Sequence, residues 1–134
     1  MIEGLITHRS HHAPKATADR LAARISAHGA TVMARIDHAA AAAKVGLEMR
    51  PTEVLIFGNP NVGTHLMLDT QVMGLELPSK VLVWQDPDGR TCLSYEDMEW
   101  LARRFGITSS AWPAVEKLSL LTKRIVEEAA AEAS

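Results

Sequence analysis

The sequence predicts a single domain of strands and helices, with a mixed or antiparallel sheet that helices cover on one side. Short β-prone runs alternate along the chain with segments in which apolar residues recur every three or four positions, as they do on one face of a helix. The turn Asp86-Pro87-Asp88-Gly89 joins two β-prone runs directly, which is typical of an antiparallel hairpin. No repeat, low-complexity linker or break in composition divides the 134 residues, so we expect one domain over residues 1–134.

The first half of the chain alternates between strand and helix patterns. Pro14 suits the first turn of a helix, because its missing N–H costs nothing there, and Gly29 is well placed to end that helix. The alanine run 39–43 favours a short helix, and the nearly continuous apolar run 53–57 is typical of a strand covered on both faces. We expect strands over 4–8, 31–37 and 53–57, and helices over 14–29 and 38–46.

The second half begins with a turn and ends with two helices. Residues 58–61 form the turn, because glycine and asparagine accept positive φ and proline cannot continue a ladder. Asp97 can cap one helix, and Ser109 or Ser110 can cap the last one, which carries an apolar stripe. We expect, in order, a helix over 63–74, strands over 80–85 and 90–95, a helix over 98–105 and a last helix that begins near residue 110.

The charge distribution argues against several classes of partner. The chain has 14 basic and 16 acidic residues and a net charge of -2, and its basic pairs Arg103-Arg104 and Lys123-Arg124 lie among acidic neighbours. Proteins that bind nucleic acid or a membrane surface usually carry a basic stripe, so we expect neither partner. The sequence has no signal-peptide pattern and no apolar run near the roughly 18 residues of a membrane span, which predicts a cytoplasmic location by elimination.

Three candidate functional residues stand at expected strand ends or in the loops that follow. Asn59 lies in the turn 58–64, between a strand and a helix as in phosphate-binding loops, but the turn lacks both GxGxxG spacing and the P-loop lysine. His38 begins the alanine-rich helix, where it can act as a general acid or base, or simply cap the helix or form a buried hydrogen bond. Lys80 opens a strand, either as a pocket cation or as an edge lysine that discourages strand pairing.

Metal and nucleophile chemistry are not indicated. His8, His11 and His12 cluster in sequence, but adjacent residues rarely point at one centre, and no carboxylate or cysteine stands at ligand spacing nearby. The motifs HExxH and GxSxG are not present, and the single cysteine, Cys92, falls in an apolar strand where a small buried thiol is common. We therefore expect no metal site, and one cysteine cannot form an intramolecular disulfide.

Four segments carry a family resemblance: Ile36 to Ala39, Arg50 to Met67 with its Phe57-Gly58-Asn59-Pro60 core, Leu77 to Trp84, and 94–104. Together they resemble the bacterial and archaeal family catalogued as domain of unknown function 302. The resemblance implies a TATA-binding-protein-like α+β fold, with a β-α-β-β-β-β-α core and helices packed on one face of a curved, mainly antiparallel sheet. It implies no DNA binding, and it brings no established activity, cofactor or catalytic residue, so we expect no cofactor.

These observations favour a binding or sensing domain that acts as a homodimer and holds a small polar or anionic ligand. The ligand-binding candidates, which stand in the segments of the resemblance, are His38, Arg50, Asn59 and Lys80. We expect a cleft between the sheet and the loop 58–64, and a dimer surface formed by Met67, Val72, Met73 and Leu75. Two alternatives remain: a small enzyme with His38 as acid or base and Lys80 or Arg50 holding an anionic group, and a purely structural oligomerisation domain.

Overall fold

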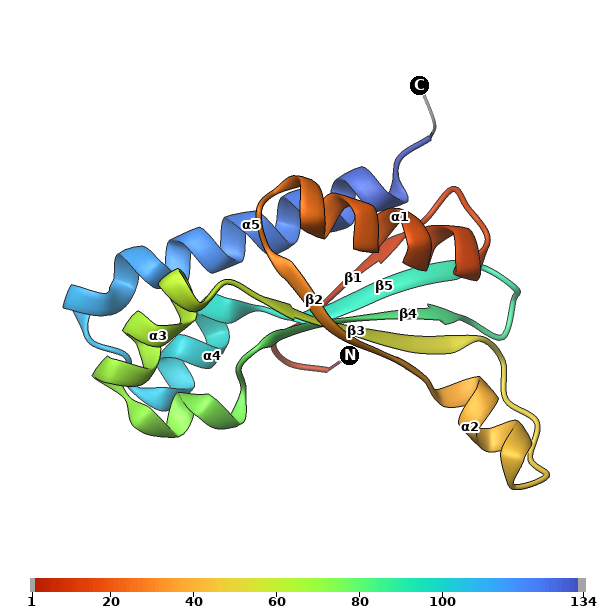
Figure 1. Cartoon of the computed structure of the whole chain (residues 1–134), viewed down its shortest axis with the longest axis horizontal. Helices are drawn as coiled ribbons and strands as arrows, with labels where there is room; N and C mark the ends of the chain where they lie inside the picture. The colour runs from red at the N-terminus through yellow and green to blue at the C-terminus, as the bar shows by residue number, and fades with distance from the viewer. Residues whose placement is uncertain (1, 133–134) are drawn as a thin grey trace.

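The computed structural model describes residues 2–132, which form one five-stranded antiparallel sheet with the two longest helices on one side (Figure 1). In chain order the elements are β1 (Leu5–Arg9), α1 (Pro14–Ala27), β2 (Thr31–Asp37), α2 (His38–Lys44), β3 (Thr52–Gly58), α3 (Pro60–Asp69), the 3₁₀ helix η1 (Gln71–Leu75), β4 (Ser79–Gln85), β5 (Thr91–Glu96), α4 (Met98–Phe105), the 3₁₀ helix η2 (Ser109–Ala111) and α5 (Trp112–Ala130). None of the described helices is both long enough and apolar enough to cross a membrane.

The strands lie in the order β1-β5-β4-β3-β2, and every neighbouring pair is antiparallel. The hairpin expected between β4 and β5 is confirmed. Its turn is held by Asp86, whose side chain accepts hydrogen bonds from the N–H groups of Asp88 and Arg90, each at 2.9 Å. If the shorter helices are set aside, the order is β-α-β-β-β-β-α, so the α+β fold class expected from the sequence is confirmed.

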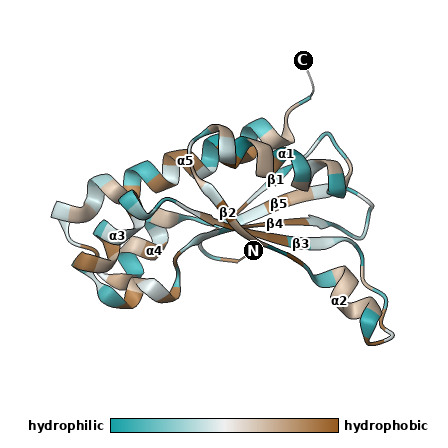
Figure 2. Cartoon of the chain, in the orientation of Figure 1, coloured by the Kyte–Doolittle hydropathy of each residue, from teal (hydrophilic) through white to brown (hydrophobic). Residues whose placement is uncertain are grey.

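Two groups of buried apolar side chains stabilise this arrangement. Helices α1 and α5 pack on one face of the sheet and bury Leu21, Ile25, Leu55, Phe57, Val81, Leu93 and Ile125 between them. A second group joins α3, η1, α4 and the first half of α5, and includes Leu66, Met73, Leu101, Val115 and Leu118. The middle strands carry mostly apolar residues, while polar and apolar residues alternate along α1 and α5 (Figure 2). Truncating one such fully buried side chain costs about 2–5 kcal/mol.

The helix after β3 begins earlier and ends earlier than the sequence pattern predicts. It spans Pro60–Asp69 rather than 63–74, because Asn59 caps it by accepting a hydrogen bond from the Asn61 N–H at 3.0 Å. Pro60 occupies the first turn, where its missing N–H is tolerated. Thr70, with extended backbone angles, ends the α-helix, and the chain continues as η1.

Two of the four residues expected to form a dimer surface belong to the core region instead. Met73 is fully buried in the second core group, and Met67 packs against that group. Val72 and Leu75 are exposed, at 59% and 76%. The apolar residues in this segment therefore have two roles: some pack against α4 and α5, and others are exposed.

The two helix caps expected near the end of the chain have different outcomes. Asp97 caps α4, since its side chain accepts from the Glu99 N–H at 3.0 Å. Neither Ser109 nor Ser110 caps α5. Both belong to η2, and α5 begins directly after it at Trp112.

Candidate functional site

Strands β4 and β5 separate at one end of the sheet. Their register runs from Gln85 opposite Thr91 to Leu82 opposite Ser94 and stops there. Strand β4 nevertheless continues to Ser79, paired with β3, and β5 continues to Glu96, paired with β1. Each strand therefore stays in the sheet through its outer neighbour while an opening forms between the two.

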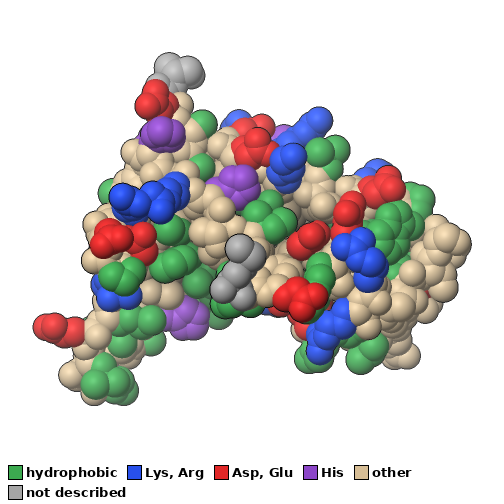
Figure 3. Space-filling view, turned by 180° about the vertical axis from the view of Figure 1, so that it is seen from behind, with side chains coloured by type: hydrophobic (Ala, Val, Ile, Leu, Met, Phe, Trp, Pro, Cys, Tyr) green, Lys and Arg blue, Asp and Glu red, His purple; other side chains and the backbone are tan. Residues whose placement is uncertain are grey.

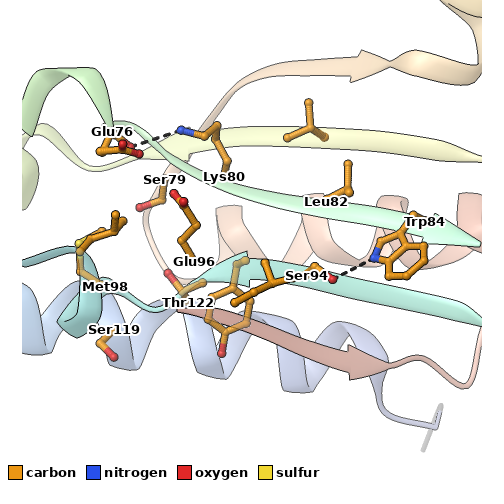
Figure 4. Close-up of a pocket in the computed structure, with 14 residues that line it drawn as sticks. Glu76, Ser79, Lys80, Leu82, Trp84, Ser94, Glu96, Met98, Ser119 and Thr122 are labelled. Atoms are coloured by element: carbon orange, nitrogen blue, oxygen red, sulfur yellow. Dashed lines mark hydrogen bonds between the residues drawn. The ribbon is translucent and has the colours of Figure 1, made fainter. Parts of the chain in front are cut away.

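A cavity of about 310 Å³ lies at this opening (Figure 4). Its walls are mainly apolar, and Leu82 and Trp84 contribute from β4 and Met98 from α4. The hydroxyl-bearing residues Ser79 and Thr122 also line it, and each is only 8% exposed. The cavity therefore combines an apolar wall with hydrogen-bonding groups, which is the usual composition of a small-molecule site.

Three charged side chains, those of Glu76, Lys80 and Glu96, line the same cavity. Lys80 on β4 donates a hydrogen bond to the backbone carbonyl of Glu76 at 3.4 Å. The Glu76 carboxylate lies 3.8 Å from the guanidinium of Arg104 on α4. Glu96 extends from β5, and Figure 4 shows its carboxyl group reaching toward Ser79 and Lys80.

The surroundings of Glu96 raise the pKa of its carboxyl group above the ordinary value for glutamate. Partial burial is the largest cause, followed by the negative charge of Glu76 and a hydrogen bond with it. The positive charges of Lys80 and Arg104 act in the opposite direction. Glu96 therefore retains a proton at higher pH than a fully solvated glutamate, and in that form it can donate a hydrogen bond.

A chain of hydrogen bonds fixes the wall of the cavity. The indole Nε1–H of Trp84 donates to Ser94 Oγ at 2.9 Å, and Ser94 Oγ lies 2.8 Å from Thr7 Oγ1. The chain links β4, β5 and β1 across the sheet. Trp84 thus has a defined orientation before any ligand arrives, which lowers the entropic cost of binding.

The structure separates the four residues that the sequence nominated. Lys80 lines the cavity at the β4–β5 opening. Asn59 borders a smaller hollow of about 160 Å³ beside the loop 58–64, which is the cleft expected from the sequence but does not include Lys80. Arg50 donates through Nε to the backbone carbonyl of Gln85 at 3.1 Å, at the opposite end of β4. His38 is exposed at the start of α2, so the four side chains do not meet in one cleft.

Sequence reasoning missed most of the cavity. Ser79 stands in the recognised segment Leu77 to Trp84, directly beside Lys80, and could have been nominated from that position. Glu96 stands in the recognised segment 94–104 and had the same signal. Glu76 and Ser119 had none, because their proximity to the cavity depends on the packing of η1 and α5.

The other reactive side chains have local partners. His12 Nε2 lies 2.6 Å from the carbonyl of Ala131, and His8 stacks on Tyr95 with ring centres 6.2 Å apart. Among residues 2–132, no three metal-ligating side chains come together. Cys92 is buried, and mainly this burial raises the pKa of its thiol.

Comparisons with known proteins identify relatives of the chain. Two proteins named fluoride-specific ion channel, FluC 1 of Brucella suis biovar 1 (strain 1330) and FluC 2 of Brucella melitensis biotype 1, are each 39% identical to it over 129 residues. These matches cover 96% of this chain but 51% and 48% of the relatives, so the chain spans about half the length of the curated relatives it matches.

A solved structure shares the fold. The crystal structure of an uncharacterised conserved protein from Bacillus stearothermophilus has a TM-score of 0.85 and 16% identity, and the match covers 96% of this chain and 99% of that one. The family model described as "Domain of unknown function DUF302" matches residues 6–125. This chain belongs to the DUF302 family, as its sequence segments indicated.

Proposed function

We propose that this chain is a small-molecule-binding domain whose ligand occupies the opening between β4 and β5. The observation that carries the proposal is the early end of the β4–β5 register, which leaves a cavity inside the sheet rather than on a loop. Its volume of about 310 Å³ is near the lower limit for ligand pockets, so the ligand is small.

The charges around the cavity favour a ligand with one anionic group and a short apolar part. The Lys80 ammonium group donates hydrogen bonds to an anion, and Glu96 also donates when it is protonated. Arg104 offsets the charge of Glu76, which is the other carboxylate at the cavity. Leu82 and Trp84 then accommodate the apolar part.

We extend the proposal to a sensing role on the basis of the relatives. The name of these relatives describes whole proteins of about twice this length. In those proteins, the half that matches this chain would bind a ligand and so regulate the remainder. Fluoride is therefore one anion to test directly.

Homodimer formation, as expected from the sequence, is part of the proposed function. Met73 is buried and Met67 packs against the core, so Val72 and Leu75 are the members of the surface first expected that remain exposed.

The experiment titrates butyrate, butylamine and sodium fluoride into the protein by calorimetry and maps binding by amide chemical shifts. We expect butyrate to bind at residues of the β4–β5 opening, and Lys80→Ala to weaken it by about tenfold. Lys117→Ala, an exposed lysine on α5 outside the cavity, is the matched control. If butylamine binds as well as butyrate, or if the shifts lie elsewhere, the proposed ligand class is wrong.

The pH dependence of butyrate binding tests the role of Glu96. Because its pKa is raised, the protonated donor form becomes more populated as pH falls through the folded-state pKa, and butyrate binding should strengthen in that direction. Glu96→Gln keeps a donor at every pH, so its binding should be stronger than wild type near neutral pH and nearly independent of pH. Equal pH dependence in the two proteins would show that Glu96 does not contact the ligand.

A further inference from the structure

The face of the sheet opposite α1 and α5 carries a row of apolar side chains across β2, β3 and β4. Ile36, Val54 and Leu82 stand opposite one another on β2, β3 and β4. Trp84 follows on the same face of β4, and Leu5 borders the opening on β1. Leu5 and Ile36 are 39% and 42% exposed. We call this surface the open face.

The segment 38–50, which we call the arm, extends away from the body of the domain. It consists of α2 and the loop that returns to β3, and it lies on the side of the sheet away from α1 and α5 (Figure 1). None of the seven residues of α2 is buried. Three apolar side chains of the loop, Val45, Leu47 and Met49, are 72%, 64% and 51% exposed.

The arm and the open face form one surface. Leu47 and Met49 share a groove with Leu82 and Trp84, and the last two also line the β4–β5 cavity. The molecule is hollowed between the arm and the lobe formed by α3, η1 and α4 (Figure 3). Val45, Leu47 and Met49 are more than half exposed beside this groove, and exposed apolar residues gathered in one place mark an interface more often than residues scattered singly.

The charges on the two parts of this surface are complementary. The arm carries Lys44 at the end of α2 and Glu48 in the loop. The cavity end of the open face carries Glu96 and Lys80. An arm placed across this face can pair Lys44 with Glu96 and Glu48 with Lys80, and a two-fold axis repeats both pairs.

We propose that the arm of one copy lies across the open face of a second copy, and that the second arm does the same in return. This inference rests on the homodimer included in the proposed function and names its surface. Val45, Leu47 and Met49 bury against the partner's Leu82, Val54 and Ile36. The tip of each arm then lies at the mouth of the partner's cavity.

The experiment measures dimer dissociation by sedimentation velocity over a range of protein concentrations. We expect a dimer, and Leu47→Glu should raise its dissociation constant by at least about tenfold, because it places a charge in an apolar interface. Leu47 is exposed, so the substitution leaves the fold intact, which circular dichroism verifies. Leu68→Glu on α3, where the leucine is 78% exposed, is the matched control and should leave the dimer unchanged.

A charge exchange provides a second measurement. Lys44→Glu should weaken the dimer, and combining it with Glu96→Lys should restore much of the loss. A monomer at all concentrations overturns the homodimer together with this surface. If Leu47→Glu leaves the dissociation constant unchanged, or if Leu68→Glu raises it, the protein forms a dimer but the arm is not its interface. Butyrate binding is measured separately, so neither result decides the ligand proposal.

Discussion

Replacing Gly4 with alanine should destabilise the protein by a local steric conflict that the structure defines. Gly4 precedes β1 with a φ of +76°, and its carbonyl accepts a hydrogen bond from the Asp97 N–H at 2.7 Å. A Cβ atom at this position meets the Trp100 ring at 2.5 and 2.6 Å. Trp100 is itself held by a hydrogen bond from its Nε1–H to Glu3 Oε1 at 3.2 Å.

Two costs contribute to the expected loss of stability. The left-handed backbone conformation costs an alanine about 1–2 kcal/mol. Relief of the contact with Trp100 requires the ring or the β1 backbone to move, and such overpacking costs about 1–3 kcal/mol. Trp100 is only partly buried, so the ring can yield and the second cost falls in the lower part of that range. We expect a total of about 2–4 kcal/mol.

Urea unfolding of Gly4→Ala and Gly89→Ala separates the two costs. Gly89 has a similar φ of +83°, but nothing lies within 4 Å of its Cβ position, so this control reports the backbone cost alone. In a Trp100→Ala background, Gly4→Ala should lower the free energy of unfolding by no more than Gly89→Ala does. Equal losses for Gly4→Ala and Gly89→Ala in the presence of Trp100 would refute the steric argument.

Two further predictions follow from side-chain contacts. Arg35 bonds Glu53 at 2.9 and 3.0 Å and Asp19 at 3.0 Å, joining β2 to β3 and α1, so Arg35→Ala should lower the free energy of unfolding by about 1 kcal/mol. Urea titration at low and high salt checks this, and a loss that does not shrink with salt contradicts an ionic origin. Cys92, with its buried thiol of raised pKa, should react with a disulfide reagent far more slowly in the native protein than in urea; equal rates would contradict its burial.

Local sequence patterns were sufficient to predict most of the strands and helices of the fold. The hairpin could be predicted because Asp86 and Gly89 have a strong intrinsic preference for a tight turn. The start of α3 was missed because Asn59 and Pro60 suit both a turn and a helix N-terminus. Only the cap that Asn59 forms in the structure distinguishes these possibilities.

The candidate site was predictable only in part, because it depends on which strands stay paired. Lys80 was nominated as a residue at a strand end, and it does line the cavity. The runs that become β4 and β5 have ordinary strand patterns as far as Ser79 and Glu96. Nothing in those patterns reveals that the register between them stops at Leu82. The separation is a tertiary property, set by the different outer neighbours of the two strands.

The ligand and the partner's arm are coupled through Glu96, which is common to both proposals. An anion at the cavity is favoured by protonated Glu96, whereas Lys44 of a second copy is favoured by the ionised form. Burial raises the pKa of Glu96 most, the negative charge of Glu76 adds to this, and the positive charges of Lys80 and Arg104 oppose it. The approach of another positive charge should therefore lower this pKa. Dimer formation through the arm therefore releases a proton and strengthens as pH rises through that pKa, while butyrate binding weakens. Because linkage is reciprocal, a ligand that loosens the dimer must itself bind more weakly to the dimer by the same factor. A domain built in this way converts ligand concentration into a change of assembly, which is the property that a sensing role requires.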